Sequence, residues 1–269
     1  MRSIVAAALS MMLLDGCSHD TLPQGESSGE QNGVQSQPVQ SENSSTEEAS
    51  KSMESSVAEE VQTGTDAPVL LYMGQASIRI VTPENKVIYI DPYAGDKYDL
   101  PADLILVTHS HFDHSMVEKV SNRTDDCQII THEEAVQNGE HRIFKLDYVT
   151  VESVEAGYNR LHDVRNCVGY VLTFTNGKSV YVTGDTSKTE QMPLLAEKQI
   201  DYAFFCCDGV YNMGLEEAAE CAELVDAKHN IPYHMTTTTT GRQFDREIAE
   251  QFEAENRLIV EDGEEILIN

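Results

Sequence analysis

Short apolar or alternating runs, rich in β-branched residues, recur along the chain from residue 68 onward and predict β-strands. The run Asp103–Thr108 is almost continuously apolar, as is typical of a strand buried on both faces. Pro83 and Asn85 separate two of the runs, which indicates a hairpin. The predicted strands are Val69–Met73, Ser77–Val81, Lys86–Ile90, Asp103–Thr108, Gln128–Thr131, Tyr148–Val154, Val168–Phe174, Ser179–Thr183, Tyr202–Phe205, Arg257–Val260 and Glu265–Ile268.

Four segments favour helices instead. They are Ser115–Val120, Thr189–Glu197, Leu215–Ala227 and Phe244–Asn256. In the third segment the apolar residues recur at helical spacing. Strands come first in a run and then mix with helices, an order that two packed sheets with helices outside would satisfy.

The N-terminus has a different pattern. Residues 1–17 contain Arg2 and then Ile4–Leu14, an apolar run of eleven residues that is too short to span a bilayer as a mature helix. The run ends in Leu14-Asp15-Gly16-Cys17, which resembles a bacterial lipobox. That resemblance implies cleavage before Cys17, lipidation of Cys17 and an extracytoplasmic protein anchored to the bacterial membrane. An ordinary secretory signal is the alternative.

Residues 18–66 contain no aromatic side chain and are rich in Ser, Glu, Gln and Thr. Such a segment cannot bury enough apolar surface to offset its ordering entropy, so we expect a disordered acidic tether. The folded domain is therefore expected over residues 67–269.

Charge narrows the possible partners. The whole chain has a net charge of -28, and residues 67–269 alone carry 35 acidic and 16 basic side chains, a net near -19. Nucleic-acid binders usually present a basic face to phosphate groups, so a nucleic-acid partner is disfavoured. The six cysteines show no zinc-ligand spacing, and Cys206 and Cys207 lie in an apolar run that predicts buried small side chains.

The chemistry of the chain concentrates in Thr108-His109-Ser110-His111-Phe112-Asp113-His114, directly after a predicted buried strand. Imidazole and carboxylate groups are strong ligands for zinc and similar divalent ions. Residues two apart in an extended segment point the same way, so His109 and His111 can reach one ion together. A tight turn through Phe112 would direct Asp113 and His114 toward a second ion.

This His-x-His-x-Asp-His pattern resembles the signature of the metallo-β-lactamase superfamily, and the rest of the chain supplies other landmarks of that family in order. They are Tyr72–Ser77, Ile90–Tyr93, Ala156–Val171, Gly184-Asp185-Thr186 and Ile231–His234. The stretch Ala156–Val171 is similar to a subgroup that includes proteins like L-ascorbate-6-phosphate lactonase. The resemblance implies an αββα sandwich, an α/β fold of four layers. It covers about residues 68–268 and specifies the metal site better than the substrate.

Carried over residue by residue, the resemblance implies two divalent metal ions, zinc first, with manganese or iron as alternatives. One ion would be held by His109, His111 and His162, the other by Asp113, His114 and His234, and Asp185 would bridge them. His162 lies in a variable stretch, so a surface histidine remains its alternative.

The expected activity is hydrolysis of an ester, lactone or phosphodiester by a metal-bridging hydroxide. Asp113 and Asp185 would act as catalytic residues that orient the nucleophile and accept its proton. Tyr158 and Asn159 are candidates for binding the substrate or its oxyanion, or for buried packing. The substrate would be a small molecule or derived from a lipid.

Four other functions compete with this expectation. β-Lactam hydrolysis fits the landmarks less well, and the net charge disfavours a nuclease. Flavin-linked reduction would need a Glu ligand and a flavin domain, neither of which the sequence shows. A non-catalytic metal-binding envelope lipoprotein is the alternative from another class. The sequence does not indicate the oligomeric state.

Overall fold

The computed structural model describes residues 65–237 and 243–269. The signal peptide 1–17 with Cys17, and nearly all of the tether 18–66, lie outside the described residues and stay predictions. In the described ranges, no helix combines the length and the apolar character needed to cross a membrane.

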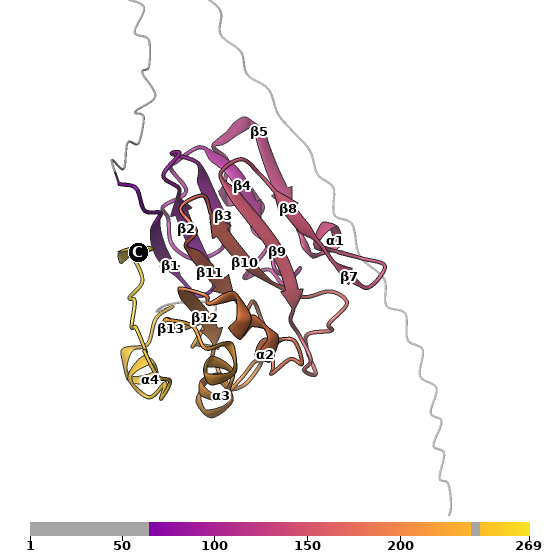
Figure 1. The fold of residues 1–269 in the computed structure, drawn as a ribbon, viewed down its shortest axis with the longest axis vertical. Helices are drawn as coiled ribbons and strands as arrows, with labels where there is room; N and C mark the ends of the chain where they lie inside the picture. The colour runs from indigo at the N-terminus through magenta and orange to yellow at the C-terminus, as the bar shows by residue number, and fades with distance from the viewer. Residues whose placement is uncertain (1–64, 238–242) are drawn as a thin grey trace, which may run out of the picture. The chain divides into compact units, whose positions relative to one another are not determined.

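Two six-stranded sheets form the body of the domain (Figure 1). The first has the strand order β14-β1-β2-β3-β4-β5 and the second β13-β12-β11-β10-β9-β8. The first sheet contains β1 (Val69–Gly74), β2 (Ser77–Val81), β3 (Val87–Ile90), β4 (Ala102–Leu106), β5 (Arg123–Ile130) and β14 (Glu265–Leu267). The second contains β8 (Ile143–Lys145), β9 (Val149–Glu155), β10 (Val168–Phe174), β11 (Ser179–Val182), β12 (Tyr202–Cys206) and β13 (His229–Tyr233). A small hairpin of β6 (Val136–Gln137) and β7 (Glu140–His141) was not predicted.

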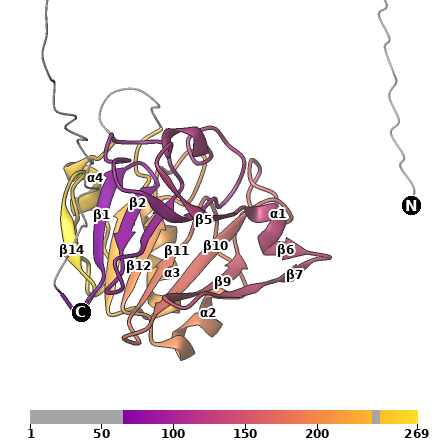
Figure 2. The same cartoon turned by 90° about the horizontal axis from the view of Figure 1, so that it is seen from above.

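The helices are shorter than the sequence pattern predicts. They are α1 (His132–Ala135), α2 (Met192–Leu195), α3 (Leu215–Val225) and α4 (Arg246–Glu250), with 3-10 turns η1 (Val117–Lys119) and η2 (Ala196–Lys198). Helix α3 packs against β12 and α2, and Figure 1 shows both helices below β12. Figure 2 shows the same fold from above. Pro193 lies in the first turn of α2, where its fixed φ and missing N–H are tolerated, so the helix begins later than predicted.

Alternation along β1 explains how the sheets pack. Leu70 and Tyr72 point into the main core between the sheets, whereas Leu71 and Met73 join a second cluster with Tyr98. The loop around Tyr98 and the short 3-10 turn η1, through Val117 and Val120, therefore cover the outer face of the first sheet. Both faces of the strand are buried, as the apolar runs predict, and Cys206 and Cys207 are buried in the core as expected.

The predicted helix over Ser115–Val120 is wrong, since only the single turn η1 forms there. The Arg123 guanidinium accounts for this outcome. It donates to the Val120 carbonyl at 2.6 Å and to the Val117 carbonyl at 2.6 Å, which a longer helix would have used internally.

The predicted strand over Arg257–Val260 is also wrong. The segment forms one isolated bridge, in which the Asn230 amide donates to the Asn256 carbonyl and the Leu258 amide donates to the Asn230 carbonyl. The next residue of β13 whose backbone faces this segment is Pro232, which has no N–H to continue the ladder.

Parallel pairing places the functional loops together. β3 pairs with β4 in parallel, and β11, β12 and β13 are mutually parallel, so the loops after these strands emerge at the same edge of each sheet. The Val168 amide donates to the Thr108 carbonyl at 3.0 Å, and the Tyr170 hydroxyl donates to the Val107 carbonyl at 3.0 Å. These bonds tie the two edges to each other. The sandwich with both sheets face to face confirms the predicted fold class.

Candidate metal centre

The loop after β4 carries four of the predicted ligands: His109, His111, Asp113 and His114. The His114 amide donates to the His111 carbonyl at 3.0 Å, which closes a tight turn through Phe112. This turn places Asp113 and His114 in a group distinct from that of His109 and His111, as the sequence predicts.

Three further ligands arrive from distant parts of the chain. His162 comes from the loop between β9 and β10, Asp185 follows β11, and His234 follows β13. Gly184 precedes Asp185 with φ +63°, and His234 itself has φ 44°. Left-handed backbone at a non-glycine residue is costly and tends to be kept at functional positions. The structure therefore brings all seven predicted ligand residues together.

Asp185 lies between two groups of histidines. Its Oδ2 atom is 3.2 Å from Nε2 of His162 and 3.9 Å from Nε2 of His109. Its Oδ1 atom is 3.2 Å from Nε2 of His114 and 3.3 Å from Nε2 of His234. Each oxygen of one carboxylate thus faces a different ligand group.

The remaining ligand atoms complete the two groups. Nδ1 of His111 is 3.1 Å from Nε2 of His162 in the first group. In the second, Oδ2 of Asp113 is 3.6 Å from Nε2 of His234 and 3.9 Å from Nε2 of His114. Within each group the ligand atoms lie within 4.8 Å of one another, close enough to hold an ion.

Oxygen atoms behind the histidines fix their ring orientation. Nδ1 of His114 lies 2.8 Å from Oδ2 of Asp91, and Nδ1 of His162 lies 3.0 Å from Oδ1 of Asn159. Nδ1 of His234 lies 3.6 Å from Oδ2 of Asp208. Such partners hold the outer ring nitrogen of a metal-binding histidine and leave Nε2 directed at the ion.

Several inward-facing atoms have no hydrogen-bond partner in the described part of the chain. They are Nε2 of His109, Nε2 of His114 and Oδ1 of Asp185. Although the last two atoms are 3.2 Å apart, their orientation does not make a hydrogen bond. Buried polar atoms without partners are costly, and divalent ions in the two groups would satisfy all three. The donor set therefore fits a metal.

The electrostatics of the two carboxylates and of His109 suit the same role. Burial by itself would raise the pKa of Asp185, but His234 and His114 outweigh it and hold that pKa well below its usual value. At Asp113, burial again raises the pKa while His234 and His114 lower it, and the net effect is a lowered pKa. Burial, and then His114, lowers the pKa of His109 far below its usual value. Ionised carboxylates and a neutral imidazole are the forms that bind metal.

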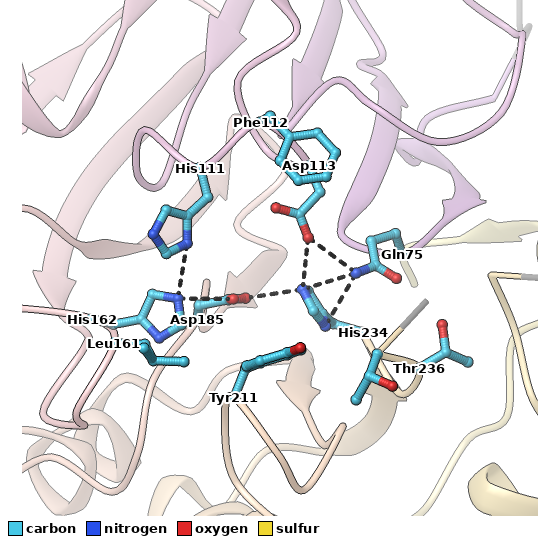
Figure 3. A pocket seen from close by; sticks show the side chains of 11 residues that line it. Gln75, His111, Phe112, Asp113, Leu161, His162, Asp185, Tyr211, His234 and Thr236 are labelled. Atoms are coloured by element: carbon cyan, nitrogen blue, oxygen red, sulfur yellow. Dashed lines mark hydrogen bonds and ion pairs between the residues drawn. The ribbon is translucent and has the colours of Figure 1, made fainter. Parts of the chain in front are cut away.

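A pocket of about 310 Å³ opens onto this cluster (Figure 3). Its lining consists of Gln75, His111, Phe112, Asp113, Leu161, His162, Asp185, Tyr211, His234, Thr236 and Thr237. Five of the predicted ligands therefore face a space that a small molecule can enter.

Tyr158 and Asn159, the predicted substrate-binding residues, are absent from this lining. Oδ1 of Asn159 accepts hydrogen bonds from the amides of Leu161 and His162 and contacts the His162 ring, so it orients a ligand histidine. The Tyr158 side chain is exposed and interacts with Glu155. Their substrate-binding role stays a prediction without support from the pocket.

Three residues at the site were not predicted to have a function. Asp91 stood only as a family landmark, although its position directly after the apolar run of β3 is a signal of the same kind that located His109. Asp208 follows β12 and Gln75 sits in the turn between β1 and β2. Nε2 of Gln75 lies 3.3 Å from Oδ2 of Asp113 and 3.1 Å from Nε2 of His234.

Comparison with known proteins agrees with this geometry. Residues 69–234 match the family described as Beta-lactamase superfamily domain. The chain is 31% identical over 188 residues to the UPF0173 metal-dependent hydrolase of Ligilactobacillus salivarius, covering 62% of this chain and 85% of that protein. It is 28% identical over 248 residues to a UPF0173 metal-dependent hydrolase of Thermodesulfovibrio yellowstonii, covering 75% and 92%. The crystal structure of a metal-dependent hydrolase from Parabacteroides distasonis superposes with a TM-score of 0.59 at 27% identity, covering 72% of this chain and 93% of that one.

Proposed function

The chain belongs to the metallo-β-lactamase superfamily, and from that membership we propose that it is a metal-dependent hydrolase with two divalent ions. Its substrate would be an ester, a lactone or a phosphodiester. The names of the relatives from Ligilactobacillus salivarius and Thermodesulfovibrio yellowstonii support the hydrolase part of this proposal. They carry no substrate name.

One observation carries the proposal: the two oxygens of Asp185 face two separate ligand groups. A single carboxylate placed in this way is suited to bridge two ions. His109, His111 and His162 would hold one ion, and Asp113, His114 and His234 the other. Zinc suits this set of imidazoles and carboxylates, and manganese or iron are alternatives.

Divalent ions held there would supply a water nucleophile at neutral pH and Lewis acidity toward the scissile group. The residues of the chain do the rest. The low pKa values of Asp113 and Asp185 keep both carboxylates ionised, so they can accept hydrogen bonds from a water molecule and orient it. Acceptance of a proton from that water is the second part of the role that we propose for them. The outer contacts of Asp91 and Asn159 keep two histidine rings fixed while this happens.

The bond changes of the reaction balance as follows. The water oxygen forms a new bond to the carbonyl carbon or to phosphorus, and the bond from that atom to the leaving oxygen breaks. The proton taken from water passes to the leaving oxygen. An ester would give a carboxylic acid and an alcohol, and a phosphodiester would give a monoester and an alcohol.

The test is to measure tightly bound metal by elemental mass spectrometry in the purified protein and in Asp185→Asn. We expect close to two equivalents in the parent and a clear fall in the variant, together with hydrolysis that a chelator abolishes. Asp201→Asn is the matched control because Asp201 is about as buried as Asp185 but pairs with Lys228 away from the cluster. It should retain the metal.

A parent protein that holds no metal even after zinc or manganese is supplied would contradict the proposal. Two bound ions without hydrolysis of any ester, lactone or phosphodiester would instead favour the non-catalytic metal-binding alternative.

A further inference from the structure

Large apolar side chains gather around the mouth of the metal centre. Nine large hydrophobic residues are exposed in the described ranges, and five of them lie in three loops at this edge of the sandwich. These five are Phe112, Tyr158, Leu161, Val210 and Tyr211. Single exposed apolar residues need no explanation, but a group beside a pocket marks a binding surface.

Three of these residues line the pocket itself: Phe112, Leu161 and Tyr211, here called the apolar rim. They are 53%, 43% and 46% exposed, so they do not serve as core. Figure 3 shows them flanking the ligand cluster, with Phe112 on one side and Leu161 and Tyr211 on the other.

The residues that orient the ligand histidines also position the apolar rim. Oδ1 of Asn159 accepts a hydrogen bond from the Leu161 amide at 3.0 Å and also contacts the His162 ring. Oδ1 of Asp208 accepts from the Tyr211 amide at 2.6 Å, while its Oδ2 faces His234. Asn159 and Asp208 therefore each contact both a rim residue and a ligand histidine. These shared contacts fix the distance between the apolar rim and the metal centre.

The Phe112 side chain is fixed in its own way. It lies between ligands His111 and Asp113 in the sequence, and its ring packs edge-on against Tyr93 with centroids 5.7 Å apart. The rim is therefore pre-formed, which lowers the entropy cost of binding an apolar group.

The polar lining of the pocket indicates an uncharged substrate. None of its described residues is Lys or Arg, and the groups besides the ligands are the neutral Gln75, Thr236 and Thr237. Two bound ions would place positive charge at the floor of the pocket, where Asp113 and Asp185 offset about half of it. No described cation lines the pocket to hold a second anionic group, and the net charge of residues 67–269 near -19 repels anions at longer range.

We propose that the apolar rim binds the short alkyl or aromatic substituent of an uncharged carboxylic ester, open or cyclic, whose carbonyl group lies over the metal centre. The substrate class rests on the proposed hydrolase function, whereas binding of the apolar group by the rim does not. A pocket of about 310 Å³ is at the small end for ligand sites, which favours a small ester.

The first experiment compares 4-nitrophenyl acetate, butyrate and hexanoate with bis(4-nitrophenyl) phosphate as substrates of the zinc-loaded protein. We expect kcat/KM to rise about threefold to fourfold for each methylene group that the rim buries, and the phosphodiester to be the poorer substrate. Phe112→Ala and Leu161→Ala should flatten this dependence, chiefly through KM. Leu194→Ala is the matched control, because Leu194 is 63% exposed on α2 and lies outside the pocket lining.

The second experiment needs no turnover. Saturation-transfer NMR measures binding of 2-butanone, 2-hexanone and 2-octanone, neutral carbonyl compounds that water does not cleave. Binding should strengthen with chain length in the parent and in Leu194→Ala, and weaken in both rim variants. Because the rim residues are exposed, we expect these variants to fold, and circular dichroism checks it.

The outcomes separate the two proposals. Ester hydrolysis that does not depend on acyl length or on Phe112 and Leu161, or a preference for the phosphodiester, would overturn the rim proposal and leave the hydrolase intact. Ketone binding that depends on the rim, without metal-dependent hydrolysis of any substrate, would support the rim and overturn the hydrolase. Ketone binding that ignores chain length or the rim variants would overturn the rim in either case.

Discussion

The carboxylate of Asp91 decides which nitrogen of His114 can bind a metal. Asp91 is fully buried and accepts hydrogen bonds from the Thr108 amide at 2.8 Å and from its hydroxyl at 2.7 Å. Because both oxygens of Asp91 act as acceptors, Nδ1 of His114 must donate its N–H to Oδ2. The lone pair of Nε2 then points into the second ligand group.

Asp91→Asn should lower the affinity for metal by about 10-fold to 100-fold. An amide NH₂ facing Nδ1 would force the proton onto Nε2, and the flipped amide would meet the Thr108 N–H with another donor. A competition titration against a chromophoric chelator measures the change.

Asp163→Asn is the matched control, since Asp163 follows His162 directly but its exposed carboxylate pairs with Arg165. An affinity in Asp91→Asn equal to that of the parent would show that Asp91 does not set the tautomer.

Residue patterns predicted the ligand residues more fully than the residues that orient them. His109, His111, Asp113 and His114 stand close together in one loop, so their spacing carries chemical information. Asp208 has no such spacing, because it acts on His234 only after β12 and β13 pair in parallel. The apolar rim was missed for a related reason: its three residues come from three loops that meet only in the folded chain.

At the scale of elements, the close approach of β10 to the loop after β4 depends on Gly184. A Cβ atom there would lie 2.8 Å from the Val168 carbonyl oxygen and 3.0 Å from Cβ of Thr108. The residue also has φ +63°, which L-residues adopt at a cost. Since Asp185 follows directly, any shift of this backbone moves the carboxylate that we propose to bridge the two ions.

Gly184→Ala should destabilise the fold by about 2–4 kcal/mol, from backbone strain of about 1 kcal/mol and overpacking of about 1–3 kcal/mol. Gly177→Ala separates the two contributions, because Gly177 has φ +82° but nothing within 4 Å of the added atom. Urea unfolding of both variants measures the difference, and metal content should fall only in Gly184→Ala. Equal losses of stability would mean that the contacts at Gly184 relax without cost.

Elements were predicted well where local pattern and tertiary environment agree. β2 and β10 have the predicted bounds, because their runs are buried on both sides. The errors occur where a single residue, either distant in the sequence or chemically special, determines where an element ends. Arg123 occupies the carbonyls that would have extended η1, and Pro232 stops the ladder that would have included Arg257–Val260.

At the scale of the whole molecule, the overall negative charge and the cluster of ligand residues act on divalent cations in different ways. A net charge near -19 over residues 67–269 attracts divalent cations, yet the site needs exact placement of few ligands. Salt at 0.1 M screens the first effect beyond about 10 Å and leaves the buried ligand groups largely unaffected. The fold and the clustering of the seven predicted ligand residues followed from the sequence, whereas the substrate depends on loops whose mutual positions the sequence pattern does not encode.

Removing metal should lower the stability of the entire domain. Ligands that bind only the folded state stabilise it by about 2.7 kcal/mol at a concentration 100 times the Kd. Thermal unfolding with EDTA should therefore occur at a lower temperature than with zinc, and the midpoint should rise with the zinc concentration. Magnesium, which prefers oxygen ligands, is the control and should have little effect. A midpoint that ignores zinc would contradict ion binding by the native fold.

The ligand residues stand in four separate stretches of chain, at 109–114, 162, 185 and 234, while the described cysteines form no disulfide. Bound ions would cross-link these stretches and close the long loops between them, a role that secreted proteins often give to cystine bridges. These cross-links would then lie at the reaction centre itself. Unlike a disulfide, such a cross-link resists reductants and yields to chelators or acid, so loss of catalysis and loosening of the chain would occur together.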